Sequence, residues 1–313
     1  MTASAPRRQI QIMRSVIRDV FYVLLGVLIP LASFTTGLQA PKPGRGEARL
    51  WRRPRQLTRD LLAVLILVPL WVIAVVLVLP LSPAIRAGLL ISTLAVGIGP
   101  VSAMKRMGPT TPAAREALDL NLIVLVISLA FVPLAFAGLA ALFRSDVHLG
   151  VGAVAKVVLG RALVPLLLGL GAARLWPRFA GSAGPVLLKI LNVALLLLLV
   201  AALAVAGKQL AGVSRIGWFA CAAASLGAIV IGHLMGGPEP GTRAVVAAAS
   251  VMRFPALALA LAAVTRQGPR LIPVILAYVL TSFVFLIVYG LVMSRRARKR
   301  AEVVPLHAVP RTT

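Results

Sequence analysis

The sequence predicts an all-α integral membrane protein with nine transmembrane helices, arranged as an inverted repeat with two broken helices. Three observations support this fold class: an apolar composition, long uncharged segments, and two interruptions at corresponding positions. Of the 313 residues, 60% are hydrophobic and 13% are charged, and the mean hydropathy is +0.97. A soluble domain is about 45–50% apolar and about 25% charged. The composition therefore excludes a soluble globular enzyme, a disordered chain and a disulfide scaffold.

Nine apolar segments are long enough to cross a bilayer, which takes about 20 residues of helix. They are rich in Leu, Val and Ala and show no alternation of polar and apolar residues, which favours helices over a transmembrane barrel. The first segment follows several arginines without a small-residue cleavage site, so we interpret it as mature protein rather than a signal peptide. The segments lie at 20–40, 61–81, 84–104, 120–143, 151–173, 186–206, 214–235, 243–264 and 271–293.

Two of these segments are interrupted. The third contains GIGP (97–100), and the eighth contains MRFP (252–255); their prolines, Pro100 and Pro255, lie 155 residues apart, and the flanking segments repeat an offset of about 150. Because that offset spans an odd number of segments, the second copy would enter the membrane upside down. Paired interrupted helices in corresponding positions point to the substrate site of a transporter. The alternative is that Gly and Pro are simply common in membrane helices.

The repeat divides the chain into four parts. The first repeat (20–143) would hold four helices and the second (151–293) five, so that one helix is missing at the front. A basic N-terminal tail (1–19) precedes the repeats, and a basic, disordered C-terminal tail (294–313) follows them.

The net charge of +25 comes from 33 Lys and Arg against 8 Asp and Glu. The basic residues are split among short loops, which indicates anionic lipid headgroups rather than nucleic acid as their partner. With nine spans, one side carries 19 of them, including the RRARKR cluster (295–300), and the other side carries 10. The positive-inside rule then places the C-terminus in the cytoplasm and the N-terminus outside a plasma membrane, although the basic N-terminus argues the other way.

Three stretches resemble the bile acid:sodium symporter family, over about 20–293. They are SVMRFPALALALA (250–262), RLWRRPRQL (49–57) and GIGPVSAMKRM (97–107). The resemblance implies a transporter whose two broken helices cross near the bilayer midplane and form the site. It also implies an organic anion as substrate, such as a bile-acid-like steroid or a small carboxylate.

The chain departs from that family where sodium-coupled members bind their ion. In the second crossover, the family's Glu falls at Ala249, its Gln at Arg253 and its Asn at Phe254; in the first, its Ser-Asn pair falls near Ala103 and Met104. Sodium needs oxygen ligands, and this chain has a guanidinium at a position where the family has an oxygen ligand. We therefore expect no sodium binding in the family's manner, and the sequence predicts neither a resident metal nor a cofactor.

Arg253 is the strongest candidate for a functional side chain. An arginine near the bilayer centre costs about 2.5–3.5 kcal/mol on insertion scales, and no Asp or Glu lies deep in any segment to pair with it. Its expected partners are carbonyls freed by the broken helix or an anion in transit. A fixed positive charge in place of sodium is an equally open alternative.

The other candidate substrate-binding residues lie in or near the interruptions or are isolated polar residues in apolar segments. Asparagines more commonly hydrogen-bond between helices. Hydroxyl groups at Ser92, Thr93, Thr281 and Ser282 either line a cavity or bond their own helix. Cys221 is alone, which excludes an intrachain disulfide, and no nucleotide loop, metal cluster or nucleophile–base spacing indicates an enzyme. The candidates are Gly97, Gly99, Pro100, Ser102, Pro255, Asn121, Asn192 and Arg161.

The sequence offers no clear carrier for ion coupling. Asp19, Asp60 and Asp119 each begin a segment, where a carboxylate caps the helix, and Asp119 and His233 are the only candidates for proton coupling. Uniport or exchange is therefore our hypothesis. Two rivals stay open: a transport-inactive receptor or scaffold that keeps the fold, and an unrelated transporter fold. The oligomeric state does not follow from the sequence.

Overall fold

The structure is a computed structural model that describes residues 23–24, 26–39, 54–95, 123, 126–127, 151–263 and 268–303. Within these ranges the chain forms helices and carries no strand. Five helices are long and apolar enough to cross a membrane, at Pro54–Val78, Pro177–Ala204, Arg215–Met235, Pro240–Ala263 and Arg270–Arg296. The predicted all-helical membrane protein is thereby confirmed, whereas the count of nine and the inverted repeat stay predictions.

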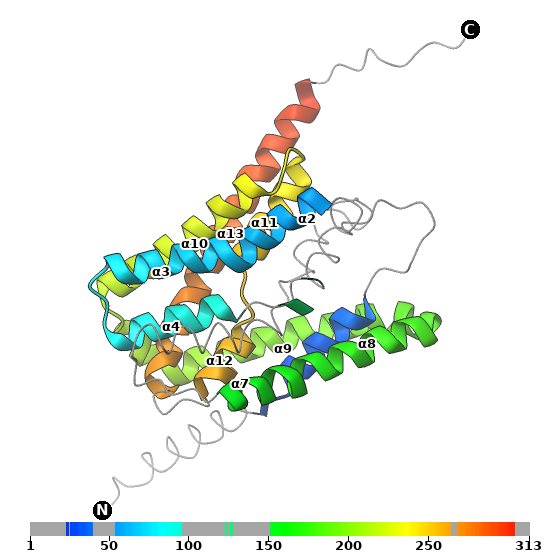
Figure 1. Cartoon of the computed structure of the whole chain (residues 1–313), viewed down its shortest axis with the longest axis horizontal. Helices are drawn as coiled ribbons and strands as arrows, with labels where there is room; N and C mark the ends of the chain where they lie inside the picture. The colour runs from blue at the N-terminus through cyan, green and yellow to red at the C-terminus, as the bar shows by residue number, and fades with distance from the viewer. Residues whose placement is uncertain are drawn as a thin grey trace, which may run out of the picture.

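Figure 1 shows the order of the helices along the chain. A first apolar helix runs from Gly26 to Leu38. The others are α2 (Pro54–Leu62), the π-helix η2 (Ala63–Leu67), α3 (Val68–Val78), α4 (Pro83–Leu94), α7 (Val151–Val158), the π-helix η3 (Leu159–Leu163), α8 (Val164–Leu175), α9 (Pro177–Ala211), α10 (Arg215–Met235), α11 (Pro240–Val251), α12 (Pro255–Ala263) and α13 (Gly268–Val303).

Several helices extend beyond the predicted segments. The second begins at Pro54 rather than 61, and the sixth at Pro177 rather than 186, because proline is well suited to the first turn of a helix. The last continues to Val303 rather than ending at 293, since Arg, Lys and Ala are good helix formers. Of the fourth segment, 120–143, only three helical residues lie within the described chain.

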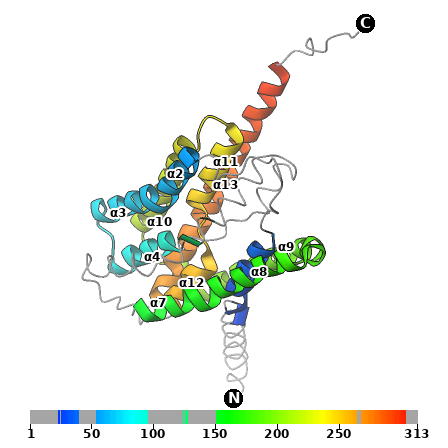
Figure 2. The ribbon, with the colours of Figure 1, turned by 45° about the vertical axis from the view of Figure 1, so that its right-hand side comes forward.

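The helices form two groups (Figures 1 and 2). In the first, α10 packs against α3, α11 and α13, and α4 packs against α3 and α13; we call this the α10 group, and it includes α2 and η2. In the second, the Gly26–Leu38 helix lies with α7, η3, α8 and α9; we call this the α8 group. The short helix α12 contacts α4 and α13 on one side and α7 on the other.

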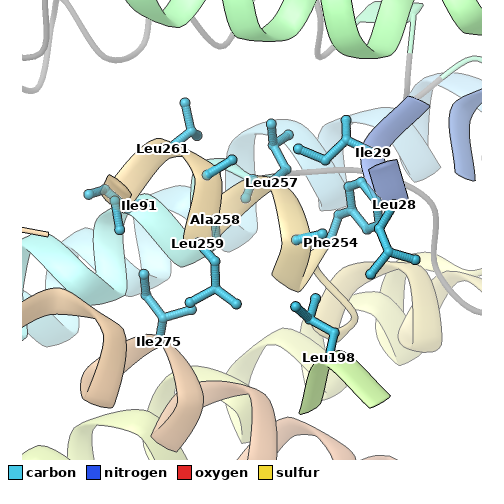
Figure 3. Close-up of a cluster of buried hydrophobic side chains, with 14 of the residues drawn as sticks. Leu28, Ile29, Ile91, Leu198, Phe254, Leu257, Ala258, Leu259, Leu261 and Ile275 are labelled. Atoms are coloured by element: carbon cyan, nitrogen blue, oxygen red, sulfur yellow. The ribbon is translucent and has the colours of Figure 1, made fainter. Parts of the chain in front are cut away.

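Helix α12 is the centre of the molecule. In the span Pro240–Ala263, which contains α11 and α12, 89% of an apolar 18-residue stretch is buried. The corresponding fraction for the span in α9 is 17%. A helix that is apolar all round is stable when it is buried all round. Figure 3 shows Leu257 and Leu259 of α12 among Leu28 of the first helix, Leu198 of α9 and Ile275 of α13. The α9 helix, in contrast, presents most of its apolar surface outward.

Candidate functional site

The predicted interruption at 252–255 is present. Helix α11 ends at Val251, residues 252–254 form no helix, and α12 begins at Pro255. Proline disfavours the helical conformation in the residue before it, but fits the first turn of a new helix. The Phe254 carbonyl accepts hydrogen bonds from the N–H groups of Leu257 and Ala258, each at 3.1 Å, and so starts α12.

The end of α4 meets this break. Helix α4 stops at Leu94, and the carbonyl of Ala95 accepts a hydrogen bond of 2.9 Å from the backbone N–H of Phe254. Both α4 and α11 are 12 residues long and begin at a proline. Five predicted site residues of the third and fourth segments lie outside the described residues: Gly97, Gly99, Pro100, Ser102 and Asn121.

The Arg253 side chain leaves the break and points toward η2. It is 4% exposed, and its Nη2 donates to the Val64 carbonyl at 3.3 Å, which is long for such a bond. Its Nε and Nη1 are buried and have no hydrogen-bond partner among the residues that the structure describes. The side chain of Tyr278 in α13 also interacts with the guanidinium. Two buried donors without acceptors are costly.

Tyr278 was not predicted from the sequence, and it ties α13 to the break. Its side chain is buried, and its hydroxyl donates to the Val251 carbonyl, the last of α11, at 3.4 Å. One turn further along α13, the hydroxyls of Ser282 and Ser225 are 2.9 Å apart. A tyrosine inside an apolar segment needs a hydrogen-bond partner for its hydroxyl. This requirement is the feature of the sequence from which Tyr278 could have been predicted.

The remaining candidates are not all brought to Arg253. Pro255 is the first residue of α12, directly beside the break. Arg161 lies exposed in η3, and Asn192 lies half-buried in α9, so both belong to the α8 group. Ser92, Thr93 and Thr281 donate to carbonyls of their own helices, as one of the two alternatives had it.

The expectation that Asp60 caps a helix was wrong, because the helix begins earlier than predicted. Asp60 is the seventh residue of α2 and is fully buried. Its Oδ1 accepts a hydrogen bond of 2.7 Å from Nε2 of Gln56, one turn before it. His233, a candidate for proton coupling, has its Nδ1 2.8 Å from the Tyr289 hydroxyl. This contact joins α10 to α13, and an interhelical hydrogen bond accounts for it.

Basic residues gather at one end of the α10 group. Gly237, between α10 and α11, has φ of +78° and packs against Gln56 of α2, and Arg243 donates to the Gly237 carbonyl. The exposed side chains of Arg55 and Arg59 lie on α2 at this end. At the opposite end, the Ile85 side chain of α4 approaches Gly217 of α10. These contacts place the start of α2 beside the turn between α10 and α11, at the end of the α10 group opposite the α4–α10 contact.

Among the described residues, no group of three or more His, Cys, Asp or Glu side chains could hold a metal ion. At the break itself, the charged group is the guanidinium of Arg253.

The structure describes a multi-pass membrane protein with a buried arginine at a broken helix, and broken membrane helices are a feature of secondary transporters. The model of the sodium bile acid symporter family matches residues 47–213, more than half of the chain. The chain therefore belongs to this family, whose members are transporters and not enzymes. A comparison with curated protein sequences finds no match. Because the family match ends before α10, the account of Arg253 rests on its own geometry.

Proposed function

We propose that the protein is a secondary transporter of a small organic anion, and that it is not sodium-coupled in the family's manner. The observation that carries the proposal is Arg253, which is buried at the α11–α12 break and whose Nε and Nη1 have no partner among the described residues. The family transports small organic substrates such as bile acids. In this proposal, the Arg253 site determines which substrate binds and whether an ion is transported with it.

The chemistry of the guanidinium favours a carboxylate. Its N–H donors lie in one plane and form parallel pairs that match the two oxygens of a carboxylate. Each parallel pair includes Nη2, and the Val64 carbonyl takes only one of the two N–H groups of Nη2, which leaves the other to pair with Nε or Nη1. A carboxylate is a stronger acceptor than a backbone carbonyl, and it would neutralise a charge that is otherwise costly to bury.

Sodium independence follows from the same side chain. By the sequence resemblance, Arg253 falls where sodium-coupled members of the family have an amide ligand, so a cation tethered to the chain would replace the ion there. The positive charge at the break is then permanent, and no ion needs to enter with the substrate. Uniport or anion exchange fits this arrangement.

Alternating access would come from movement of the α10 group against the α8 group around α12. The matched length and proline start of α4 and α11, and the contact of Phe254 with Ala95, support an inverted repeat with crossed broken helices. Asn192 and Arg161 would contribute from the α8 group, with Gly97, Gly99, Pro100, Ser102 and Asn121 completing the first crossover. The basic end would face the cytoplasm of a plasma membrane and bind anionic lipid headgroups.

A thermal-shift screen of carboxylates on purified protein tests the proposal. We expect a bound carboxylate to raise the unfolding temperature of the wild type and not of Arg253→Gln. Loss of a hydrogen bond to a charged group, about 1.5–3 kcal/mol, weakens binding by about tenfold or more. Lys156→Gln is the matched control, because Lys156 is an exposed cation in α7. Equal stabilisation of wild type and Arg253→Gln would refute the role of Arg253. Binding without flux would favour the transport-inactive alternative.

A further inference from the structure

Arg253 donates to the Val64 carbonyl, which has no N–H donor at the expected position of the π-helix η2. In the π-helix η2, the Val68 N–H bonds to the Ala63 carbonyl five residues before it. The next carbonyl in this register, Val64, faces Pro69, which has no N–H to donate. Val64 is also fully buried, so water is absent as a substitute donor. The Nη2 of Arg253 supplies the missing hydrogen bond, from 189 residues away in the sequence.

We propose that Pro69 is a positioning residue for Arg253. By withholding a backbone N–H, Pro69 leaves the Val64 carbonyl as the acceptor that holds the guanidinium at the break between α11 and α12. The bond joins η2 to the break and fixes which donors of Arg253 stay available. Its consequence for transport rests on the proposed function; the bond itself does not.

The length of this bond suits a holding contact. At 3.3 Å it is longer than a strong N–H···O bond, which is about 2.9 Å. A weak acceptor keeps the side chain oriented without satisfying it, so that a carboxylate can recruit the remaining donors. π-helical turns of this kind are frequent at functional sites.

The chain carries a second copy of the same local motif, which serves as a control. The sequence Leu-Val-Pro-Leu occurs at 67–70 after η2 and again at 163–166 after η3. In η3, the Val164 N–H likewise bonds to a carbonyl five residues back, that of Leu159. The carbonyl left over there belongs to Gly160, which is exposed with open space beside it. Pro165 therefore lacks an N–H at the equivalent position, and no buried arginine of the described chain bonds to the freed carbonyl.

The experiment is a double-mutant cycle with Pro69→Ala, Arg253→Gln and their combination, with Pro165→Ala as control. Alanine restores an N–H that competes for the Val64 carbonyl. In detergent without any anion, we expect the change in unfolding temperature caused by Pro69→Ala to differ between the two Arg253 backgrounds by about 2 °C or more. We expect Pro165→Ala to have the same effect in both backgrounds. Should Pro69→Ala not be recovered, Pro69→Gly supplies the same N–H.

Equal effects of Pro69→Ala in both backgrounds would overturn the proposal, because Pro69 would then act only as a kink. With a transported carboxylate, Pro69→Ala should raise KM about fivefold with little change in the maximal rate, and only while Arg253 is present. Coupling in the anion-free cycle without any carboxylate transport would refute the proposed function and leave the role of Pro69 standing. If the effects of Pro69→Ala and Arg253→Gln on the unfolding temperature are additive but transport still depends on Arg253, the role of Pro69 is refuted and the proposed function stands.

Discussion

At the scale of single residues, the site depends on how the buried donors of Arg253 and Tyr278 are satisfied. The Tyr278 hydroxyl donates to the last carbonyl of α11 and interacts with the guanidinium, so it holds the break from the α13 side. Sequence reasoning found Arg253 because a charge stands out in an apolar segment. It could not find Val64, because the group that acts is a backbone carbonyl, and its availability depends on a π-helical turn.

We predict that Tyr278→Phe lowers both stability and carboxylate binding. Losing one buried hydrogen bond costs about 1 kcal/mol, so the unfolding temperature should fall by about 2–4 °C, and the anion-induced shift should shrink. Tyr289→Phe is the control, because it removes a hydroxyl that contacts His233 and not Arg253. It should lower the unfolding temperature and leave the anion-induced shift intact. A Tyr278→Phe variant with wild-type binding would show that this hydroxyl plays no part in the site.

At the scale of helices, small residues set how closely the membrane helices pack. Gly37 in the first helix and Gly169 in α8 lie where a Cβ would collide with the backbone of the other helix. Such contacts let two backbones approach directly, which is a main source of packing energy in a membrane. The sequence predicted these two helices, but not their contact, because many other glycines occupy apolar segments without a neighbour.

We predict that Gly169→Ala destabilises the protein, whereas Gly171→Ala does not. A Cβ at Gly169 would meet the Phe34 carbonyl, and nothing lies within 4 Å of a Cβ at Gly171. Overpacking costs about 1–3 kcal/mol, whereas alanine in an open helical position is favoured over glycine by about 1 kcal/mol. Thermal unfolding of the two variants in one detergent measures the difference. Similar unfolding temperatures would mean that the first helix does not pack on α8 in this way.

At the scale of the whole molecule, the sequence predicted the positions of membrane helices better than their ends or their packing. The sequence located the five helices that are long and apolar enough to cross a membrane, and the break at Pro255, because long apolar runs and a proline inside one of them are local features. It misplaced helix ends by up to about ten residues, since amphipathic turns such as 54–60 extend beyond the apolar core. The division into the α10 and α8 groups depends on contacts between distant segments and could not be read locally.

We predict that the basic end of the α10 group is cytoplasmic. Arg296→Cys, at the exposed end of α13, should react with an impermeant thiol reagent only after the cells are permeabilised. Arg215→Cys, at the exposed start of α10, should react in intact cells. Cys221 is buried and is the one cysteine of the chain, so background labelling should be low. The reverse pattern of labelling would invert the proposed orientation.

The most direct test of the central claim is carboxylate exchange by purified protein in liposomes, with choline in place of every sodium ion. Cholate and pyruvate represent steroid and small carboxylates. We predict that wild-type protein exchanges a labelled carboxylate equally well in choline and in sodium, and that Arg253→Gln lowers this exchange by about tenfold or more. Exchange that appears only with a sodium gradient, or that proceeds unchanged in Arg253→Gln, would contradict the account.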